Sequence, residues 1–292
     1  MSDALQIQQQ INAFLNSRRV TRVWFAENNN APPVNACQVN FPRLSLVLSG
    51  TYDVQISDHD KVRSIEASPG EAIYIPAHCW DLPTWKQQSQ TLTFMFAHRQ
   101  IGLSLNQCSD ADSVSSLART SIPEALCNEG VLIQKAIEAI AASPGDNPSV
   151  NYLAEALIQH TSHLIPKETG NIINRTQSRW EAICLYLQKN FGQEITRDKV
   201  AEEFAITPNH LSRLFRQEGR MGFNDYLTFV RIDRAKLLLS RYQLNLDEIA
   251  TRTGFKGGDY LGRVFRKHTG LTPGEYRAKY ARKELEADSR RV

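Results

Sequence analysis

The chain has 292 residues, 41% of them hydrophobic, which is enough to fill the cores of two domains. Its five cysteines, an odd number without a CxxC pair, predict a reduced cytoplasmic protein rather than a disulfide-bonded secreted one. The N-terminus has no basic region followed by an apolar one, and no stretch reaches ~18 consecutive apolar residues, so we expect neither export nor membrane insertion.

The formal net charge of +3 is unevenly distributed. From Arg175 to Val292 there are 23 Lys and Arg residues against 15 Asp and Glu, a net of +8, whereas residues 1–174 carry a net of −5. A basic surface releases counterions when it meets phosphates, which gives affinity that falls steeply with salt. The charge therefore indicates a polyanionic partner for the C-terminal part.

Short runs of alternating or apolar residues predict β-strands in the first 110 residues. They are Leu44–Leu48, Thr51–Ile56, Ala72–Ile75, Leu92–Phe96 and Ile101–Leu105, separated by Gly50, Pro69-Gly70 and Pro76. Short strands divided in this way predict a barrel or a sandwich.

Two helices are predicted next, Glu124–Ala142 and Val150–Leu164, divided by a Pro- and Gly-containing turn. In the second, Leu153, Leu157 and Leu164 lie with Thr161 along one apolar stripe. This stripe either packs on the β domain or pairs with its copy in another chain. The polar stretch 166–176 is predicted to be a flexible linker between domains.

A short sequence then occurs twice, 50 residues apart: Leu211-Ser-Arg213-Leu-Phe215-Arg216 and Leu261-Gly-Arg263-Val-Phe265-Arg266. Tyr226 and Tyr276 follow at the same offset. In each copy the Leu and the Phe share a helix face, and two arginines flank that face. Two copies of one helical unit are predicted.

Each copy is preceded by a shorter predicted helix. Thr196 can cap the first of these, and Thr207 can cap the helix that follows. In the second copy Asn245 and Glu248 predict a capping box, and Gly254 predicts a left-handed helix end. The spacing makes the second turn one residue longer. Each copy thus predicts a helix-turn-helix, and an ordinary helical bundle is the alternative, against which the charge argues.

A helix from Asn224 to Ser240 is predicted to join the two units, with an apolar face from which Arg231 and Arg234 stand away. Such a helix spans roughly 25 Å. With the flanking packing added, the two recognition helices are expected to enter successive major grooves, ~34 Å apart.

The stretch from about Gln177 to Lys283 resembles the DNA-binding domain of AraC/XylS-type transcription regulators, in which a long helix joins two helix-turn-helix units. The positions that carry the resemblance include Ala201, Leu211, Arg213, Phe215, Met221, Phe223, Tyr226, Arg231, Ala235, Ile249, Ala250, Gly254, Phe255, Arg263, Phe265, Gly270, Pro273 and Tyr276. Two features depart from the pattern: Arg220 replaces a usual Gly, and Gly257, Gly258 and Gly262 stand where polar residues are commoner. We expect these glycines to reduce base reading by the second recognition helix.

The resemblance implies base contacts by Asn209, Ser212, Arg213, Asp259, Tyr260 and Arg263. Phosphate contacts are expected from Thr207 and from Arg216, Arg266 and Lys267, which lie further along the helices. The chemistry fits, since Arg can bind guanine with two hydrogen bonds, Asn can bind adenine, and a carboxylate can accept from cytosine. For Asp259, capping of its own helix is the alternative.

The segments Leu46–Val54 and Ser68–His78 resemble the cupin-like sensor barrel that precedes many AraC-type DNA-binding domains, over about residues 20–110. Aromatic and polar residues on or near the strands are candidates for a site that binds a sugar or small metabolite: Trp24, Tyr74, His78 and Trp80, with Trp85 beside them. Core packing is the alternative for each aromatic residue.

A metal-dependent enzyme built on this barrel is the rival function. Catalytic cupins use a His-x-His pair with further ligands, and this sequence has no His-x-His; His59, His78 and His98 are isolated. His160 and His163 are three residues apart and are interpreted as part of a solvated helix face. We therefore expect no enzyme, no metal and no cofactor.

The sequence predicts an α+β protein: a cupin-like β-barrel or jelly roll at 1–120, a helical region with a possible dimerisation role at 121–165, a linker at 166–176, an all-α double helix-turn-helix domain at 177–284, and a charged, fraying tail at 285–292. The predicted function is a ligand-responsive transcription regulator, an activator by resemblance. Its expected partners are double-stranded DNA, a small-molecule effector, a second copy of the chain, and RNA polymerase. A regulator without a small-molecule ligand is a further alternative.

Overall fold

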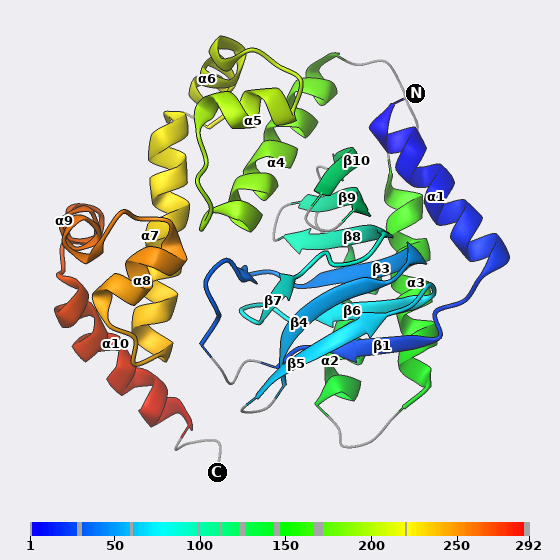
Figure 1. The fold of residues 1–292 in the computed structure, drawn as a ribbon, viewed down its shortest axis with the longest axis horizontal. Helices are drawn as coiled ribbons and strands as arrows, with labels where there is room; N and C mark the ends of the chain where they lie inside the picture. Colours follow the sequence, from blue (N-terminus) through cyan, green and yellow to red (C-terminus); the bar gives the residue numbers. More distant parts are fainter. Residues whose placement is uncertain are drawn as a thin grey trace. The chain divides into compact units, whose positions relative to one another are not determined.

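The computed structural model describes residues 2–27, 31–58, 61–97, 100–110, 113–122, 126–142, 147–165, 172–219 and 221–288, with side chains omitted at 172–178, 181 and 281–288. His59, His98, Arg220 and the first part of the predicted linker lie outside these ranges. The chain forms two compact units, Met1–Asn30 with Gln38–Leu185 and Ala31–Cys37 with Tyr186–Val292 (Figure 1).

The first unit combines strands with three helices, α1 (Asp3–Ser17), α2 (Asn128–Ala141) and α3 (Ser149–Leu164). The strands of the described chain are β1 (Arg22–Phe25), β2 (Cys37–Gln38), β3 (Arg43–Gly50), β4 (Tyr52–Asp58), β5 (Lys61–Ala67), β6 (Glu71–Ile75), β7 (Trp80–Pro83), β8 (Ser89–Ala97), β9 (Gln100–Asp110) and β10 (Ser113–Ile122). They form a six-stranded sheet in the order β1-β6-β3-β8-β9-β10 and a four-stranded sheet in the order β2-β7-β4-β5.

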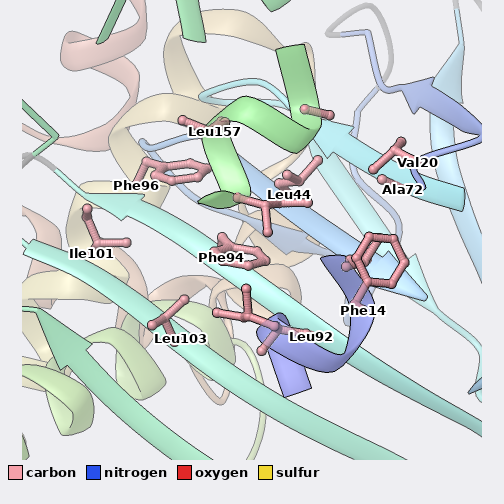
Figure 2. Close-up of a cluster of buried hydrophobic side chains, with 14 of the residues drawn as sticks. Phe14, Val20, Leu44, Ala72, Leu92, Phe94, Phe96, Ile101, Leu103 and Leu157 are labelled. Carbon is pink, nitrogen blue, oxygen red and sulfur yellow. The ribbon is translucent and has the colours of Figure 1, made fainter. Parts of the chain in front are cut away.

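Alternation along the strands gives the six-stranded sheet two different buried faces. Leu44, Leu92, Phe94 and Leu103 pack on one face with residues of α1 and α3 (Figure 2). On the other face, residues such as Ile73 share a second core with the four-stranded sheet. The first unit is therefore a layered structure in which helices cover one side of a two-sheet β region.

The predicted strands are confirmed, because each of them lies within β3, β4, β6, β8 or β9, except that β4 begins at Tyr52, one residue after the predicted start. Among the described residues the strand pairing gives two sheets, and it does not show a closed barrel. The sequence interpretation missed α1, although Ser2 caps it and Ile7, Ile11 and Phe14 form a buried stripe along it.

The predicted helices at 124–142 and 150–164 correspond to α2 and α3. Their packing corrects the predicted dimerisation site. Leu157 is fully buried in the core of its own chain, and Leu153 and Leu164 pack against the same core. This stripe packs on the β region, which is the other of its two predicted fates; Leu157 has no exposed surface, whereas Leu153 and Leu164 are partly buried.

The second unit is helical. Helix α4 (Ile172–Asn190) contributes residues up to Leu185 to the first unit and the rest to the second. The helices after it are α5 (Arg197–Glu203), α6 (Pro208–Gln217), α7 (Phe223–Arg241), α8 (Leu246–Thr253), α9 (Gly258–Thr269) and α10 (Pro273–Asp288).

Three boundaries differ from prediction or refine it. The connecting helix is α7, one residue longer at each end than predicted. Helix α4 already begins at Ile172, so residues 172–176 of the predicted linker are helical. Helix α10 continues to Asp288, so the first part of the predicted fraying tail is helical as well, in a stretch rich in the strong helix formers Ala, Glu, Lys and Arg.

Candidate nucleic-acid interface

The first helix-turn-helix consists of α5 and α6, and the predicted caps begin both helices. The Thr196 hydroxyl accepts from the Lys199 amide at 3.2 Å, and the Thr207 hydroxyl accepts from the His210 amide at 3.2 Å. On α6, Leu211, Leu214 and Phe215 are buried, which directs the opposite side of the helix to solvent.

The second helix-turn-helix consists of α8 and α9. The predicted capping box is confirmed: the Glu248 amide donates to Asn245 Oδ1, and Glu248 Oε2 accepts from the Asn245 amide, both at 2.8 Å. On α9, Leu261 and Phe265 are buried at positions equivalent to Leu211 and Phe215. The sequence repeat is thus a structural repeat.

The aromatic residues after each recognition helix pack alike in the two copies. The Phe215 and Tyr226 rings meet edge to face at 5.6 Å between centroids, and the Phe265 and Tyr276 rings do so at 5.3 Å. Each recognition helix is therefore held by an aromatic contact to the helix that follows it.

The two turns follow one plan with one residue of difference. Ala205 and Gly254, at matched positions, both have left-handed backbones with φ of 48° and 75°. One residue separates Ala205 from the cap Thr207, whereas two separate Gly254 from the cap Gly257. The predicted extra residue in the second turn is confirmed.

The start of α9 has a cap that the sequence interpretation missed. Asp247 Oδ1, from α8, accepts from the Gly258 amide at 2.7 Å. A Cβ atom at position 258 would lie 2.7 Å from the same oxygen, so a larger residue there would displace the Asp247 side chain. Asp259 is the second residue of α9, not its cap, and its side chain is exposed; the alternative capping role for Asp259 is therefore wrong.

The predicted DNA-contact residues are almost all on the surface of the second unit. Exposed side chains are those of Thr207, Asn209, Arg213, Arg216, Asp259, Tyr260, Arg263, Arg266 and Lys267. Ser212 is half-buried, and its hydroxyl donates to the Pro208 carbonyl at 3.0 Å within its own helix. Both recognition helices thus present a guanidinium group to solvent at equivalent positions, Arg213 and Arg263.

Other arginines of this unit are structural, which the charge count could not show. Arg231 Nε and Nη2 donate to the carbonyls of Phe191 at 2.9 Å and Gln193 at 3.0 Å, and burial lowers the pKa of this guanidinium. Arg234 is buried, with its guanidinium over the Phe191 ring. The expectation that Arg231 and Arg234 stand away from the packed face is therefore wrong.

Two more arginines satisfy backbone carbonyls within the second unit. Arg252 Nε donates to the Pro32 carbonyl at 2.8 Å, and Arg277 donates to the Leu244 carbonyl. The excess of basic residues thus overstates the charge available to a polyanion, since four of these side chains bind backbone oxygens or are buried.

Helix α7 determines the separation of the two recognition helices. Its 19 residues span ~28 Å. Figure 1 shows the first helix-turn-helix at one end of α7 and α8, α9 and α10 packed toward the other end. This length is comparable with the ~34 Å between successive major grooves on one face of B-DNA.

The predicted effector residues do not share one site. Tyr74 is fully buried on the helix-covered face of the six-stranded sheet, where its hydroxyl donates to Glu138 Oε1 at 2.8 Å, whereas Trp24 packs on the opposite face. Burial and the neighbouring Glu138 carboxylate raise the pKa of Tyr74. Trp80 is also fully buried, and His78 occupies a left-handed turn with φ of 67°. For Tyr74 and Trp80, core packing is the correct interpretation.

A cleft of about 450 Å³ lies beside β1 in the first unit. Val23, Phe25 and Ile140 give it apolar walls, and Asn147 and Asn151 give it polar ones. Asn151 Nδ2 donates to the Thr21 carbonyl at 2.9 Å. The volume is in the range of small-molecule sites, and the four predicted effector residues do not line it.

Within the described ranges, no three or more His, Cys, Asp and Glu side chains gather as a metal site would require. In the same ranges, no helix has both the length and the apolar character needed to cross a membrane.

Residues 200–279 match the helix-turn-helix domain family. The chain is 35% identical over 266 residues to the helix-turn-helix-type transcriptional regulator YpdC of Escherichia coli, covering 91% of this chain and 92% of that protein. It is 32% identical over 259 residues to YijO, also a helix-turn-helix-type transcriptional regulator of Escherichia coli, covering 89% of each chain.

Among solved structures, the chain is similar to the C-terminal domain of AraT, a response regulator from Geobacillus stearothermophilus, with 34% identity and a TM-score of 0.34 over 35% of this chain and 84% of that one. The relatives that match along most of the chain are transcription regulators, not enzymes. Together with the paired helix-turn-helix units described above, the family match over residues 200–279 and the likeness to YpdC and YijO show that the chain belongs to the AraC-type DNA-binding transcription regulators.

Proposed function

We propose that one chain reads two adjacent major-groove segments of a DNA duplex, through α6 and α9, and that the first unit adjusts this reading in response to a small molecule. The proposal rests on the equivalent exposure of Arg213 on α6 and Arg263 on α9, two helices that pack toward opposite ends of the 19-residue helix α7.

The exposed side chains divide by chemistry into those that can specify a base and those that position the protein. Arg213 and Arg263 can each donate two hydrogen bonds to guanine O6 and N7, and Asn209 can pair with adenine in the same way. Arg216, Arg266 and Lys267 lie further along the helices, where contacts to phosphates orient the helix without reading sequence.

The two helices are not proposed to contribute equally. On α9, Gly258 serves the contact with Asp247, and Gly262 has no side chain to offer to a base. Base reading by α9 therefore depends on Asp259, Tyr260 and Arg263. We infer that α6 provides more of the sequence preference and α9 more of the phosphate contact.

The proposal is tested by selecting bound fragments from a random DNA pool with the full-length protein. Arg213→Ala should weaken binding to the selected site by ~1 to 3 kcal/mol while changing binding to scrambled DNA much less. Lys135→Ala, which removes an exposed cation of the first unit, is the control and should leave both affinities unchanged. Equal losses on selected and scrambled DNA for Arg213→Ala would contradict base reading.

For the effector, we infer that the first unit forms a cupin-like sensor and that the small molecule binds in the cleft beside β1. The support is the combination of apolar walls with the Asn147 and Asn151 amides. A thermal-shift screen of sugars and small metabolites should find a compound that raises the melting temperature, since a ligand of the folded state stabilises it. Asn151→Ala should abolish the shift, and Asn12→Ala, an exposed amide on α1, should not.

We further propose, by likeness to the family, that the protein activates transcription as a homodimer that contacts RNA polymerase. The buried leucines of α3 are not part of this proposal. Sedimentation of the free and DNA-bound protein gives the oligomeric state, and transcription from a selected site with purified polymerase gives the sign of regulation. A monomer on DNA, or repression at the selected site, would overturn this part of the proposal alone.

A further inference from the structure

We propose that Cys127 and His160 form a nucleophile and base pair in the first unit, and that this pair is a covalent modification site for small α,β-unsaturated carbonyl compounds. Cys127 Sγ lies 2.9 Å from His160 Nε2. A thiol within hydrogen-bond distance of an imidazole nitrogen is the arrangement that activates cysteine nucleophiles.

Cys127 is exposed, and its side chain does not cap the helix that it precedes. Cys127 is the residue before α2, where Ser, Thr, Asp or Asn usually caps the first turn, yet its side chain makes no capping hydrogen bond. It is exposed, whereas Cys37, Cys79, Cys108 and Cys184 are buried. Among the five thiols, an added reagent therefore reaches Cys127 first.

His160 is held in place against the first turn of α2. A Cβ atom at Gly130 would lie 3.0 Å from His160 Cδ2 and 3.1 Å from Nε2, so glycine at this position permits the close approach of the imidazole ring. His160 comes from α3, which is anchored in the core of the first unit by Leu157 and Ile158. The base is thus oriented by packing, as a functional imidazole must be.

A carboxylate completes the cluster. Glu129, in the first turn of α2, has a lowered pKa, chiefly through a hydrogen bond with the Cys127 side chain, with a smaller attraction from His160. Cys127, Glu129 and His160 thus form one polar cluster beside the start of α2.

The proposed reaction needs no oxidant and no leaving group. The Cys127 sulfur forms a bond to the β-carbon of the unsaturated carbonyl compound as its proton passes to His160 Nε2. The electron pair of the carbon–carbon double bond moves toward the carbonyl oxygen, and the proton held by His160 is then delivered to the α-carbon. A thioether remains, and His160 returns to its neutral form.

The experiment measures the rate at which methyl vinyl ketone alkylates the full-length protein, with peptide mass spectrometry locating the adduct. We expect Cys127 to react ~10-fold or more faster than glutathione in the same buffer, because general base catalysis contributes at least this much. Reaction at the rate of glutathione, or first at a buried cysteine, overturns the proposal. The measurement requires no DNA, so its failure is distinct from failure of the proposed function.

Variants separate the action of His160 from its packing. His160→Ala should slow alkylation of Cys127 ~10-fold or more, and imidazole added to the buffer should restore part of the rate. His163→Gln, which changes an exposed histidine one turn away on α3, should leave the rate unchanged. An unchanged rate in His160→Ala, or a slow rate that imidazole does not raise, contradicts the assignment of His160 as the base.

Discussion

Arg231 and Arg213 belong to the same unit, but we expect replacement of Arg231 to affect stability and replacement of Arg213 to affect DNA binding. Arg231 is half-buried and donates two hydrogen bonds to backbone carbonyls, whereas Arg213 is exposed on α6. We predict that Arg231→Met destabilises the second unit without directly removing a DNA contact, and that Arg213→Ala removes a DNA contact without destabilising the fold.

The magnitude follows from the surroundings of Arg231. Its bond to the Phe191 carbonyl is partly buried and contributes about 1.5 to 3 kcal/mol, as is usual for a charged donor. The bond to the Gln193 carbonyl is exposed, so water replaces most of it. The guanidinium also lies 5.9 Å from the centre of the Phe255 ring, a contact of about 0.5 kcal/mol. The expected loss is about 2 to 3.5 kcal/mol.

Amide hydrogen exchange of the full-length chain, followed in peptides from α7 and α8, measures this loss. A change of about 2 to 3.5 kcal/mol raises the population of the open state roughly 30- to 300-fold, since about 1.4 kcal/mol is tenfold. For Arg213→Ala the free energy of opening should lie within about 0.5 kcal/mol of that of the unmodified chain, as expected for a surface substitution. If Arg231→Met also exchanges within that margin, the structural role of Arg231 is refuted.

Four further predictions concern other parts of the structure. Gly258→Ala should weaken the Asp247 cap and destabilise α9 by about 1 kcal/mol, measured by amide hydrogen exchange. In the same measurement Gly262→Ala should be neutral or stabilising, because its Cβ atom would be 3.7 Å from its nearest neighbour. Gly254→Ala should cost about 1 to 2 kcal/mol or more, measured by urea unfolding, because φ is 75° and the added carbon would lie 2.7 Å from the Phe191 carbonyl oxygen. Arg216→Ala should weaken selected and scrambled DNA alike and reduce the slope of log affinity against log salt by about 0.9; a loss confined to the selected site would mean base reading. Because the pKa of Tyr74 is raised on folding, the contribution of this phenol to stability is fully present below pH ~10 and is lost as the pH rises further. Between about pH 9 and 11 the free energy of unfolding of Tyr74→Phe should therefore fall less than that of the unmodified chain. An identical fall in both proteins would contradict the burial argument.

Local signals in the sequence predicted much of the second unit. The caps Thr196, Thr207 and Asn245 depend on residues three positions away, and the structure confirms them. The contact between Asp247 and Gly258 joins two helices across a turn, so no local pattern indicated it. Likewise, Arg231 and Arg213 have identical chemistry, and only tertiary packing distinguishes the buried guanidinium from the exposed one.

The first unit was predicted less completely because its strands are not all amphipathic. Strand β5 is mostly exposed, with only Ile65 and Ala67 buried, so its sequence lacks a regular alternation.

The aromatic residues failed as effector candidates for a different reason. Tyr74 and Ala72 lie on the same face of β6, the face that the helices cover. The sequence alternation does not tell which face of the sheet the helices cover, so this face could not be distinguished from the one between the two sheets.

We propose that one chain reads two adjacent grooves through Arg213 and Arg263. Repeating the selection of bound DNA with Arg213→Ala and with Arg263→Ala, and aligning the recovered sites, tests this proposal. We predict that each variant loses preference at a different position and that the two positions lie about one helical turn, roughly 10 base pairs, apart. Loss of preference at the same position in both variants, or at no position in either, would contradict the claim.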